Sequence, residues 1–287
     1  MDILYAPFID YAFMRRALAA TIALSFCCPA VGVWLVLRRM SLVGDAMSHA
    51  LLPGVAVGFL VAGLSLSALT IGGMIAALIV AVLAGLVTRW TPLREDASFA
   101  AFYLVSLAVG VLIVSSFGTN VDLMRFLFGS ILAVDDHALL LVASIGSVSI
   151  VGLAIIYRPL LAECFDPEFL KSVHAHGGRY HAAFLVLVVL SLVAAFQALG
   201  TLMAVGLMML PAASGRFWAS SVSGQILSAV AMALASSYTG LLISFHGDVA
   251  SGPAIVLCAG ALYVVSLVIG RRGGIIVEHL RPRHLEA

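Results

Sequence analysis

Charged residues are scarce in this chain. Asp, Glu, Lys and Arg together make up only 10% of its 287 residues, whereas soluble domains carry about 25%. Lysine occurs once, at Lys171, and the formal net charge is +1, so the sequence offers no basic patch for nucleic acid. Because 63% of the residues are hydrophobic and the mean hydropathy is +1.15, the composition excludes an ordinary soluble domain and predicts a polytopic membrane protein.

Several catalytic motifs are also missing. Lys171-Ser172 has no Gly-rich loop before it, so the chain lacks a P-loop, and any ATP hydrolysis would come from a separate subunit. No G-x-S-x-G elbow and no H-E-x-x-H motif occurs, and we expect neither an enzyme nor a permanently bound cofactor. The four cysteines form no C-x-x-C pair, and we interpret adjacent Cys27 and Cys28 as packing residues rather than metal or disulfide ligands.

Long apolar runs dominate what is present. About 20 apolar residues cross a bilayer as a helix, which predicts an all-α membrane bundle with eight or nine transmembrane helices in a single domain over residues 1–287. The piece 121–134 is too short and polar to cross, and 200–215 is short and interrupted by Gly and Pro. The candidate spans are 17–37, 42–63, 66–88, 98–116, 138–157, 182–199, 200–215, 224–245 and 253–270.

The positive charges indicate a topology. With the N-terminus outside and all nine spans crossing, 12 of the 15 Lys and Arg residues fall on the inside, as the positive-inside rule requires. With the N-terminus inside, one candidate span would not cross, which leaves eight. The inside set is Arg38, Arg39, Arg89, Arg94, Arg158, Lys171, Arg179, Arg216, Arg271, Arg272, Arg281 and Arg283, and the outside set is Arg15, Arg16 and Arg125.

One acid and one imidazole interrupt the apolar stretch from Ser41 to Gly63. Asp45 and His49 are its only ionisable residues. Their i, i+4 spacing places both side chains on one face of a helix. A carboxylate in a bilayer costs roughly 2.5–3.5 kcal/mol even on insertion scales, so such a residue predicts a functional site. Because carboxylate oxygen and imidazole nitrogen both bind divalent transition metals, we interpret the pair as a metal site.

Two other interpretations of this pair stay open. Asp45 and His49 would also suit a hydrogen-bonded pair that joins the helices of the bundle, or a proton relay. One acid and one imidazole are too few for a closed zinc site, which takes four ligands. Two copies of the chain around a twofold axis would supply two of each, and an incomplete site suits a pathway that an ion must also leave.

The same stretch predicts close helix packing. Ala46, Ala50, Gly54 and Gly58 recur every four residues, and such a ridge of small residues allows two helices to approach closely. Pro53 lies within it, removes one backbone hydrogen bond and predicts a kink.

The segment 158–180 is the longest polar stretch and is expected on the cytoplasmic side. Asp166 is a candidate N-cap, with Pro167 at the first helical position and Glu168 in the first turn. The pattern predicts a short amphipathic helix over about residues 166–175. Two interpretations of the segment stay open, an ordinary interhelical loop and a docking helix for a soluble partner. At the expected outer mouth, His246 and Asp248 would attract a cation or simply form a solvated turn, and we favour the turn.

Residues 37–54 as a whole resemble the signature of the bacterial zinc/manganese ABC-transporter permeases, the ABC-3 family. Weaker matches follow in the family's order over about residues 12–270. They comprise 126–130, the run Asp166-Pro167-Glu168-Phe169, 200–213 and 251–257. The stretch 171–177 departs from the Arg/Ala-rich continuation that the family often has.

The resemblance implies a partnership. Two permease copies would form the path across the bacterial inner membrane, as a homodimer surrounded by lipid. Two cytoplasmic ABC ATPase subunits would drive it, and a periplasmic or surface-tethered solute-binding protein would deliver Zn²⁺ or Mn²⁺. Asp45 and His49 match the acid and the histidine of the family's pathway, and Asp166, Pro167, Glu168 and Phe169 begin its ATPase-coupling helix.

We therefore expect the permease subunit of an ATP-driven importer of divalent metal ions, with Zn²⁺ favoured over Mn²⁺. The alternatives are a proton-coupled secondary metal carrier, a non-transport membrane scaffold, and an ABC permease for a metal chelate such as a siderophore or cobalamin. A proton-coupled carrier would need several buried acids, and only Asp45 qualifies.

Overall fold

The computed structural model describes residues 2–63, 65–116, 134–165 and 177–280. Within these ranges every regular element is a helix, which confirms the all-α prediction. The helices are α1 (Asp2–Asp10), α2 (Ala12–Leu37), α3 (Ser41–Ala50), α4 (Leu52–Ala62), α5 (Leu66–Trp90), α6 (Glu95–Ser116), α8 (Asp136–Phe165), α10 (Gly177–Leu199), α11 (Thr201–Gly215), α12 (Val222–Gly247), α13 (Ser251–Ile269) and α14 (Ile275–Leu280).

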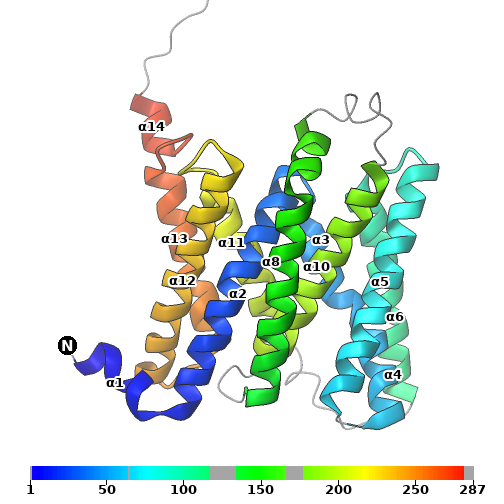
Figure 1. Cartoon of the computed structure of the whole chain (residues 1–287), viewed down its shortest axis with the longest axis horizontal. Coiled ribbons are helices and arrows are strands. Elements are labelled where there is room, and N and C mark those ends of the chain that lie inside the picture. Colours follow the sequence, from blue (N-terminus) through cyan, green and yellow to red (C-terminus); the bar gives the residue numbers. More distant parts are fainter. Residues whose placement is uncertain (1, 64, 117–133, 166–176, 281–287) are drawn as a thin grey trace, which may run out of the picture.

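The long helices run up and down between two ends of the molecule (Figure 1). Eight helical segments of the described residues are long and apolar enough to cross a membrane, with α3 and α4 counted as one. The shorter α11 adds a further apolar helix of 15 residues, and Pro211 lies inside it. This arrangement confirms a polytopic bundle of the predicted size.

The two ends differ in charge. The turns that join α2 to α3, α5 to α6, α11 to α12 and α13 to α14 lie at the upper end of Figure 1. These turns carry Arg38, Arg39, Arg94 and Arg216 together with Arg271 and Arg272. Arg15 and Arg16 follow the α1–α2 junction at the lower end. By the positive-inside rule, we expect the upper end to be the cytoplasmic end.

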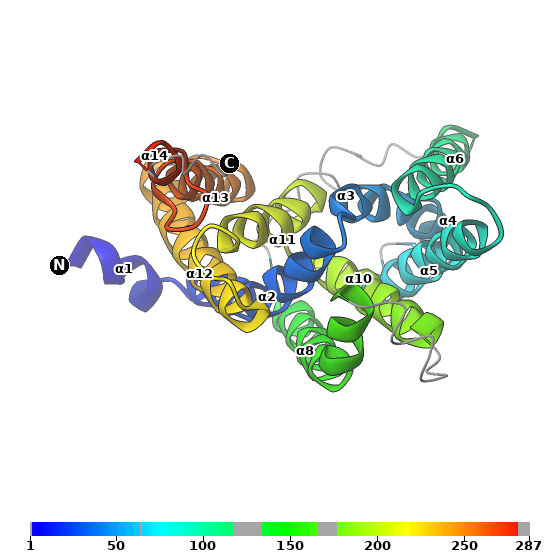
Figure 2. The same ribbon diagram turned by 90° about the horizontal axis from the view of Figure 1, so that it is seen from above.

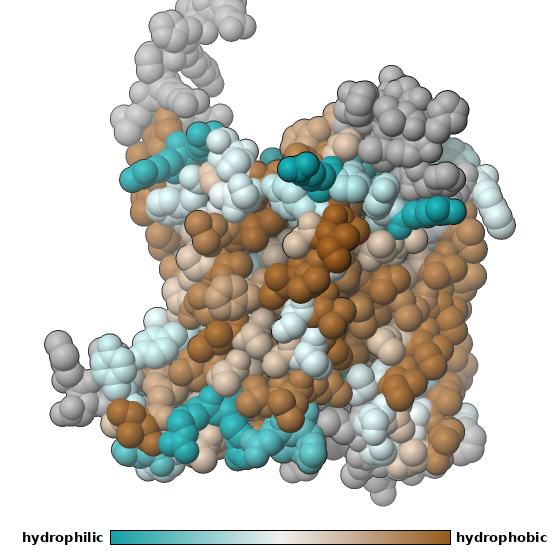
Figure 3. Space-filling view, viewed as in Figure 1, coloured by the Kyte–Doolittle hydropathy of each residue, from teal (hydrophilic) through white to brown (hydrophobic). Residues whose placement is uncertain are grey.

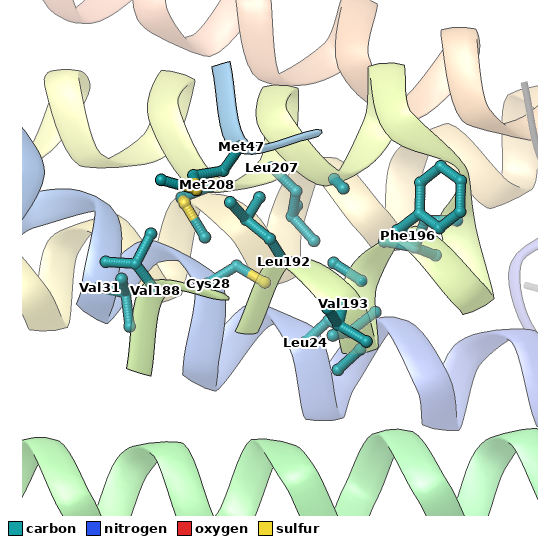
Figure 4. Packing of buried hydrophobic residues seen from close by; sticks show 14 of the residues in the cluster. Leu24, Cys28, Val31, Met47, Val188, Leu192, Val193, Phe196, Leu207 and Met208 are labelled. Atoms are coloured by element: carbon teal, nitrogen blue, oxygen red, sulfur yellow. The ribbon is translucent and has the colours of Figure 1, made fainter. Parts of the chain in front are cut away.

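Helices α2 and α10 form the centre of the bundle (Figure 2). In each, 72% of the most apolar stretch is buried inside the protein, against 22% in α6 and α8. Leu24, Cys28 and Val31 of α2 pack against side chains of α10 and α11, as Figure 4 shows. Cys27 and Cys28 are buried free thiols within this core, which agrees with the packing role predicted for them.

The outer surface suits a lipid environment. A band of apolar side chains separates two polar ends (Figure 3). Strongly exposed apolar side chains of the helices include Val61, Ile155, Leu227 and Leu257. At the lower end, Phe8 of α1 stacks on Tyr238 of α12, with ring centroids 5.3 Å apart, so α1 is held against the bundle there.

Helices α4 and α5 touch backbone to backbone. A Cβ added to Gly54 would lie 1.9 Å from the carbonyl oxygen of Gly72, and one added to Gly72 would lie 2.2 Å from that of Gly54. Gly58 similarly faces the backbone of Ala68. The small residues of the predicted ridge thus do mediate a close helix crossing, which larger side chains would prevent.

Two predicted segments lie outside the described residues. They are the short helix at 166–175 and nearly all of the piece 121–134. The single-domain organisation over residues 1–287 stays a prediction.

Candidate metal site

Asp45 and His49 lie one turn apart on α3, as their spacing predicts. His49 Nε2 is 3.8 Å from Asp45 Oδ1. That separation is within ion-pair distance but too long for a direct hydrogen bond, and the structure does not decide between a metal site, a joint between helices and a proton relay. Two ligand atoms that each bind one ion at about 2.1 Å lie roughly 3–4 Å apart. The observed spacing therefore fits two ligands of a single metal ion.

The surroundings of the two side chains differ. The His49 ring stacks on Tyr103 of α6, with centroids 6.0 Å apart and an interplanar angle of 28°, which holds the imidazole in place. Its Nδ1 atom is buried and has no hydrogen-bond partner among the residues that the structure describes. Leaving a buried polar atom unsatisfied costs about 1–3 kcal/mol, a cost that a ligand or water at this nitrogen would remove.

Asp45 is on the open side of α3. Its side chain is 60% exposed and that of His49 is 31% exposed on the single chain. A carboxylate in a membrane-spanning segment is strongly disfavoured against lipid. The exposed face of α3 is therefore suited to water or another polypeptide.

The opposite side of α3 packs on α11. A Cβ on Gly44 would be 3.7 Å from the sulfur of Met209 and 3.9 Å from that of Met208. Sequence reasoning gave these methionines no structural role, since nothing local places α11 beside α3. Thioethers prefer soft ions such as Cu(I) rather than hard divalent ions. We therefore interpret this contact as packing that fixes the rotation of α3 about its axis.

The helical structure is interrupted between α3 and α4, two residues after His49. Helix α3 ends at Ala50 and α4 begins at Leu52. Pro53 has no N–H to donate to the His49 carbonyl, which explains the break. Ser106 of α6 donates a hydrogen bond of 3.2 Å to the Ala50 carbonyl. The helix is thus interrupted beside Pro53, and a side chain of α6 hydrogen-bonds to a carbonyl at the interruption.

The other predicted residues do not join this pair. His246 Nδ1 lies 2.9 Å from the Leu242 carbonyl, and Asp248 caps α12 in the left-handed conformation, with φ of 49°. Both are exposed, His246 in the last turn of α12 and Asp248 at its C-cap, and their outer-mouth role stays a prediction. Among the described residues no group of three or more His, Cys, Asp or Glu side chains is placed to hold a metal. The predicted coupling residues Asp166, Pro167, Glu168 and Phe169 lie outside the described residues.

Comparison with known families gives one match over most of the chain. The model described as the ABC 3 transport family matches residues 10–270. This range includes Asp45, His49 and all the long apolar helices.

Individual relatives agree with that match. The chain is 32% identical over 266 residues to the "Manganese import system permease protein ScaB" of Streptococcus parasanguinis, covering 91% of this chain and 94% of the relative. It is 29% identical over 276 residues to the "Manganese transport system membrane protein MntC" of Halalkalibacterium halodurans, covering 96% and 93%. Among solved structures, "PsaBC from Streptococcus pneumoniae in complex with Fab" matches with a TM-score of 0.84 and 29% identity, covering 96% of this chain and 98% of that one.

Proposed function

The chain belongs to the ABC 3 transport family, and from this premise we propose that it is the permease subunit of an ATP-driven importer of divalent metal ions, with Mn²⁺ as its main cargo. The observation that carries the proposal is the pair on α3. Asp45 and His49 present an oxygen and a nitrogen 3.8 Å apart on the open side of a membrane-spanning helix. Both atom types are ligands of divalent transition metals.

A second copy of the chain would complete the site. One chain offers two ligands here, and the exposed carboxylate of Asp45 needs a polar neighbour inside the membrane. Two copies with α3 facing α3 would bring two carboxylates and two imidazoles to one ion. Four such ligands bind a metal firmly, whereas separation of the two α3 helices would halve the set and release the ion.

The proposed cargo differs from the zinc preference that the sequence favoured. Imidazole suits zinc, and carboxylate suits manganese. The affinity order places Zn²⁺ above Mn²⁺ at most sites of this kind, so the pair alone gives no reason to exclude zinc. Both curated relatives described above carry manganese in their names. We therefore place Mn²⁺ first and assign the discrimination against zinc to the protein that delivers the ion.

The energy source and the delivery protein are separate subunits in this proposal. The chain has no P-loop, and its arginine-rich end is the cytoplasmic end, where an ATPase pair would bind. The segment that begins Asp166-Pro167-Glu168-Phe169 connects α8 to α10 at that end, and we assign it to ATPase docking. A solute-binding protein would load the opposite end. The assembly would sit in a bacterial inner membrane.

Uptake by proteoliposomes tests the proposal. The chain is reconstituted with the ATPase and the binding protein encoded beside it, and uptake of radioactive Mn²⁺ is measured with and without ATP, with Zn²⁺ as competitor. ATP-dependent Mn²⁺ uptake that needs both partners supports the proposal. Uptake that follows a pH gradient and needs no ATPase would identify a proton-coupled carrier instead. Uptake of the metal only as a chelate would contradict the free-ion cargo.

A further inference from the structure

A partly buried polar cluster joins four helices at the cytoplasmic end. Arg38, the C-cap residue of α2, has a side chain only 9% exposed. Its Nη2 atom lies 2.6 Å from Glu163 Oε2 of α8, and its Nη1 atom lies 2.8 Å from His181 Nδ1 of α10. The guanidinium also sits over the ring of Phe184, 4.9 Å from its centroid. One side chain of α2 therefore holds both α8 and α10.

The cluster continues through the imidazole to α6. Because Nδ1 of His181 faces a guanidinium, which only donates, this nitrogen must accept the hydrogen bond. The ring hydrogen is then on Nε2, which lies 3.5 Å from Glu95 Oε1. Beside the cluster opens a hollow of about 520 Å³, whose lining includes Glu95, Glu163 and His181. The side chains thus have room for a second arrangement.

The position of the cluster in the chain suggests its use. Glu163 lies three residues before Asp166, where the proposed ATPase-docking segment begins, and His181 follows that segment at the start of α10. Arg38 therefore contacts both α8, which precedes the segment, and α10, which follows it. Any shift of those two helix ends would act on this one guanidinium.

Backbone hydrogen bonds hold the turn between Arg38 and the start of α3. Arg39 N–H donates to the Val36 carbonyl at 3.2 Å, and Met40 N–H donates to the Leu35 carbonyl at 2.9 Å. These two bonds form a Schellman motif, with Arg39 in the left-handed conformation at φ of 58°. Helix α3 begins at the next residue, Ser41. A displacement of Arg38 would therefore be passed to the helix that carries Asp45 rather than absorbed in a flexible loop.

Stability alone gives little reason for such a cluster. Replacing a buried ion pair by apolar side chains of similar volume is often neutral or stabilising, because the charges need not be desolvated. The exposed pair of Arg16 and Asp136, at 3.5 Å near the other end of α2, belongs to the class that contributes about 0–1 kcal/mol. The cluster of Arg38, Glu163 and His181, which joins α2, α8 and α10, is better suited to holding one of two alternative arrangements.

We propose that the Arg38–Glu163–His181 cluster is the mechanical link that passes movement of the α8 and α10 ends to α3 and so to Asp45. The inference rests on the proposed function and adds positioning residues to it. Arg38 touches no cargo in this scheme; it sets the position of α3 according to the state of the cytoplasmic ends of α8 and α10.

The test separates coupling from folding. The complete transporter is reconstituted, and Mn²⁺ uptake and ATP hydrolysis are measured together as ions moved per ATP. For Glu163→Gln we expect hydrolysis to continue while this ratio falls at least about fivefold, the lower end of typical allosteric coupling. Arg38→Lys should lower it as well, because one ammonium cannot reproduce the two-pronged guanidinium contact. Arg16→Gln breaks an exposed pair of the same helix and should leave the ratio unchanged.

A double variant distinguishes loss of coupling from misfolding. Arg38→Met with Glu163→Leu removes both charges, so the chain should unfold at the wild-type temperature or above it yet still transport few ions per ATP. A double variant with the wild-type ratio would overturn the inference while leaving the proposed function intact. If the wild-type transporter itself moves no metal on ATP hydrolysis, the proposed function fails, and the inference fails with it.

Discussion

The glycine contact between α4 and α5 makes a sharp prediction for Gly54→Ala. The added methyl carbon would lie 1.9 Å from the Gly72 carbonyl oxygen, whereas ordinary contact begins at 3.4 Å. The obstacle is backbone, which cannot rotate away as a side chain would. The two helices must therefore separate by about 1.5 Å at the crossing.

The expected cost follows from two opposing effects. Alanine is favoured over glycine inside a helix by about 1 kcal/mol. Overpacking that forces backbone shifts typically costs about 1–3 kcal/mol, and more in rigid surroundings. Because the overlap here is large and involves two backbones, we expect the second effect to prevail, with a net loss of about 1–2 kcal/mol in the free energy of unfolding.

Gly260→Ala is the matched control. Gly260 is also inside a helix, α13, but a Cβ at this position would have no atom within 4 Å. The helix preference then acts alone, and the variant should gain up to about 1 kcal/mol. The same substitution thus has opposite signs at the two positions.

Thermal unfolding in detergent measures both variants. Cys27 and Cys28 are 1% and 0% exposed, so a thiol-reactive fluorophore will label them only as the chain unfolds. At about 2–4 °C per kcal/mol, Gly54→Ala should lower Tm by several degrees and Gly260→Ala should raise it. A Gly54→Ala protein as stable as the wild type would refute the close crossing, as would equal shifts of the same sign.

Three further predictions concern the site and the cytoplasmic end. Asp45→Asn should abolish Mn²⁺ uptake without lowering Tm, since among the described residues only His49 lies within ion-pair distance of the exposed carboxylate; normal uptake in reconstituted vesicles would remove Asp45 from the pathway. Arg39→Gly should raise Tm by about 2–8 °C, because a left-handed residue other than glycine costs about 1–2 kcal/mol; a lower Tm would show that the Arg39 side chain stabilises the turn. Replacing Glu168 and Phe169 by alanine should reduce the amount of ATPase that co-purifies with the chain, and an undiminished yield would contradict docking at that segment.

Features encoded locally could be predicted from the sequence. The apolar runs gave the spanning helices because crossing a bilayer requires about 20 such residues whatever their neighbours. The i, i+4 spacing placed Asp45 and His49 on one face of α3 because helix geometry alone decides it. Pro53 predicted the break by the hydrogen bond that it cannot make.

Features that depend on distant parts of the chain could not be predicted. Arg38 meets Glu163 and His181 across 125 and 143 residues, and no local pattern indicates which acid an arginine will reach. The stacking of His49 on Tyr103 and the contact of Gly44 with Met208 likewise depend on how helices pack. The sequence could not decide between Zn²⁺ and Mn²⁺ as the cargo, because one acid and one imidazole bind either ion.

The open carboxylate on α3 also bears on how the protein is made. A newly inserted chain that is still alone in the bilayer turns the exposed side of Asp45 toward hydrocarbon or toward water drawn into it, at roughly 2.5–3.5 kcal/mol. A subunit that pairs with the second copy proposed above would escape this cost, whereas an unassembled one would retain it. We expect the lifetime of the chain in cells to rise with its own abundance, so that membrane proteases remove solitary copies before they can leak ions.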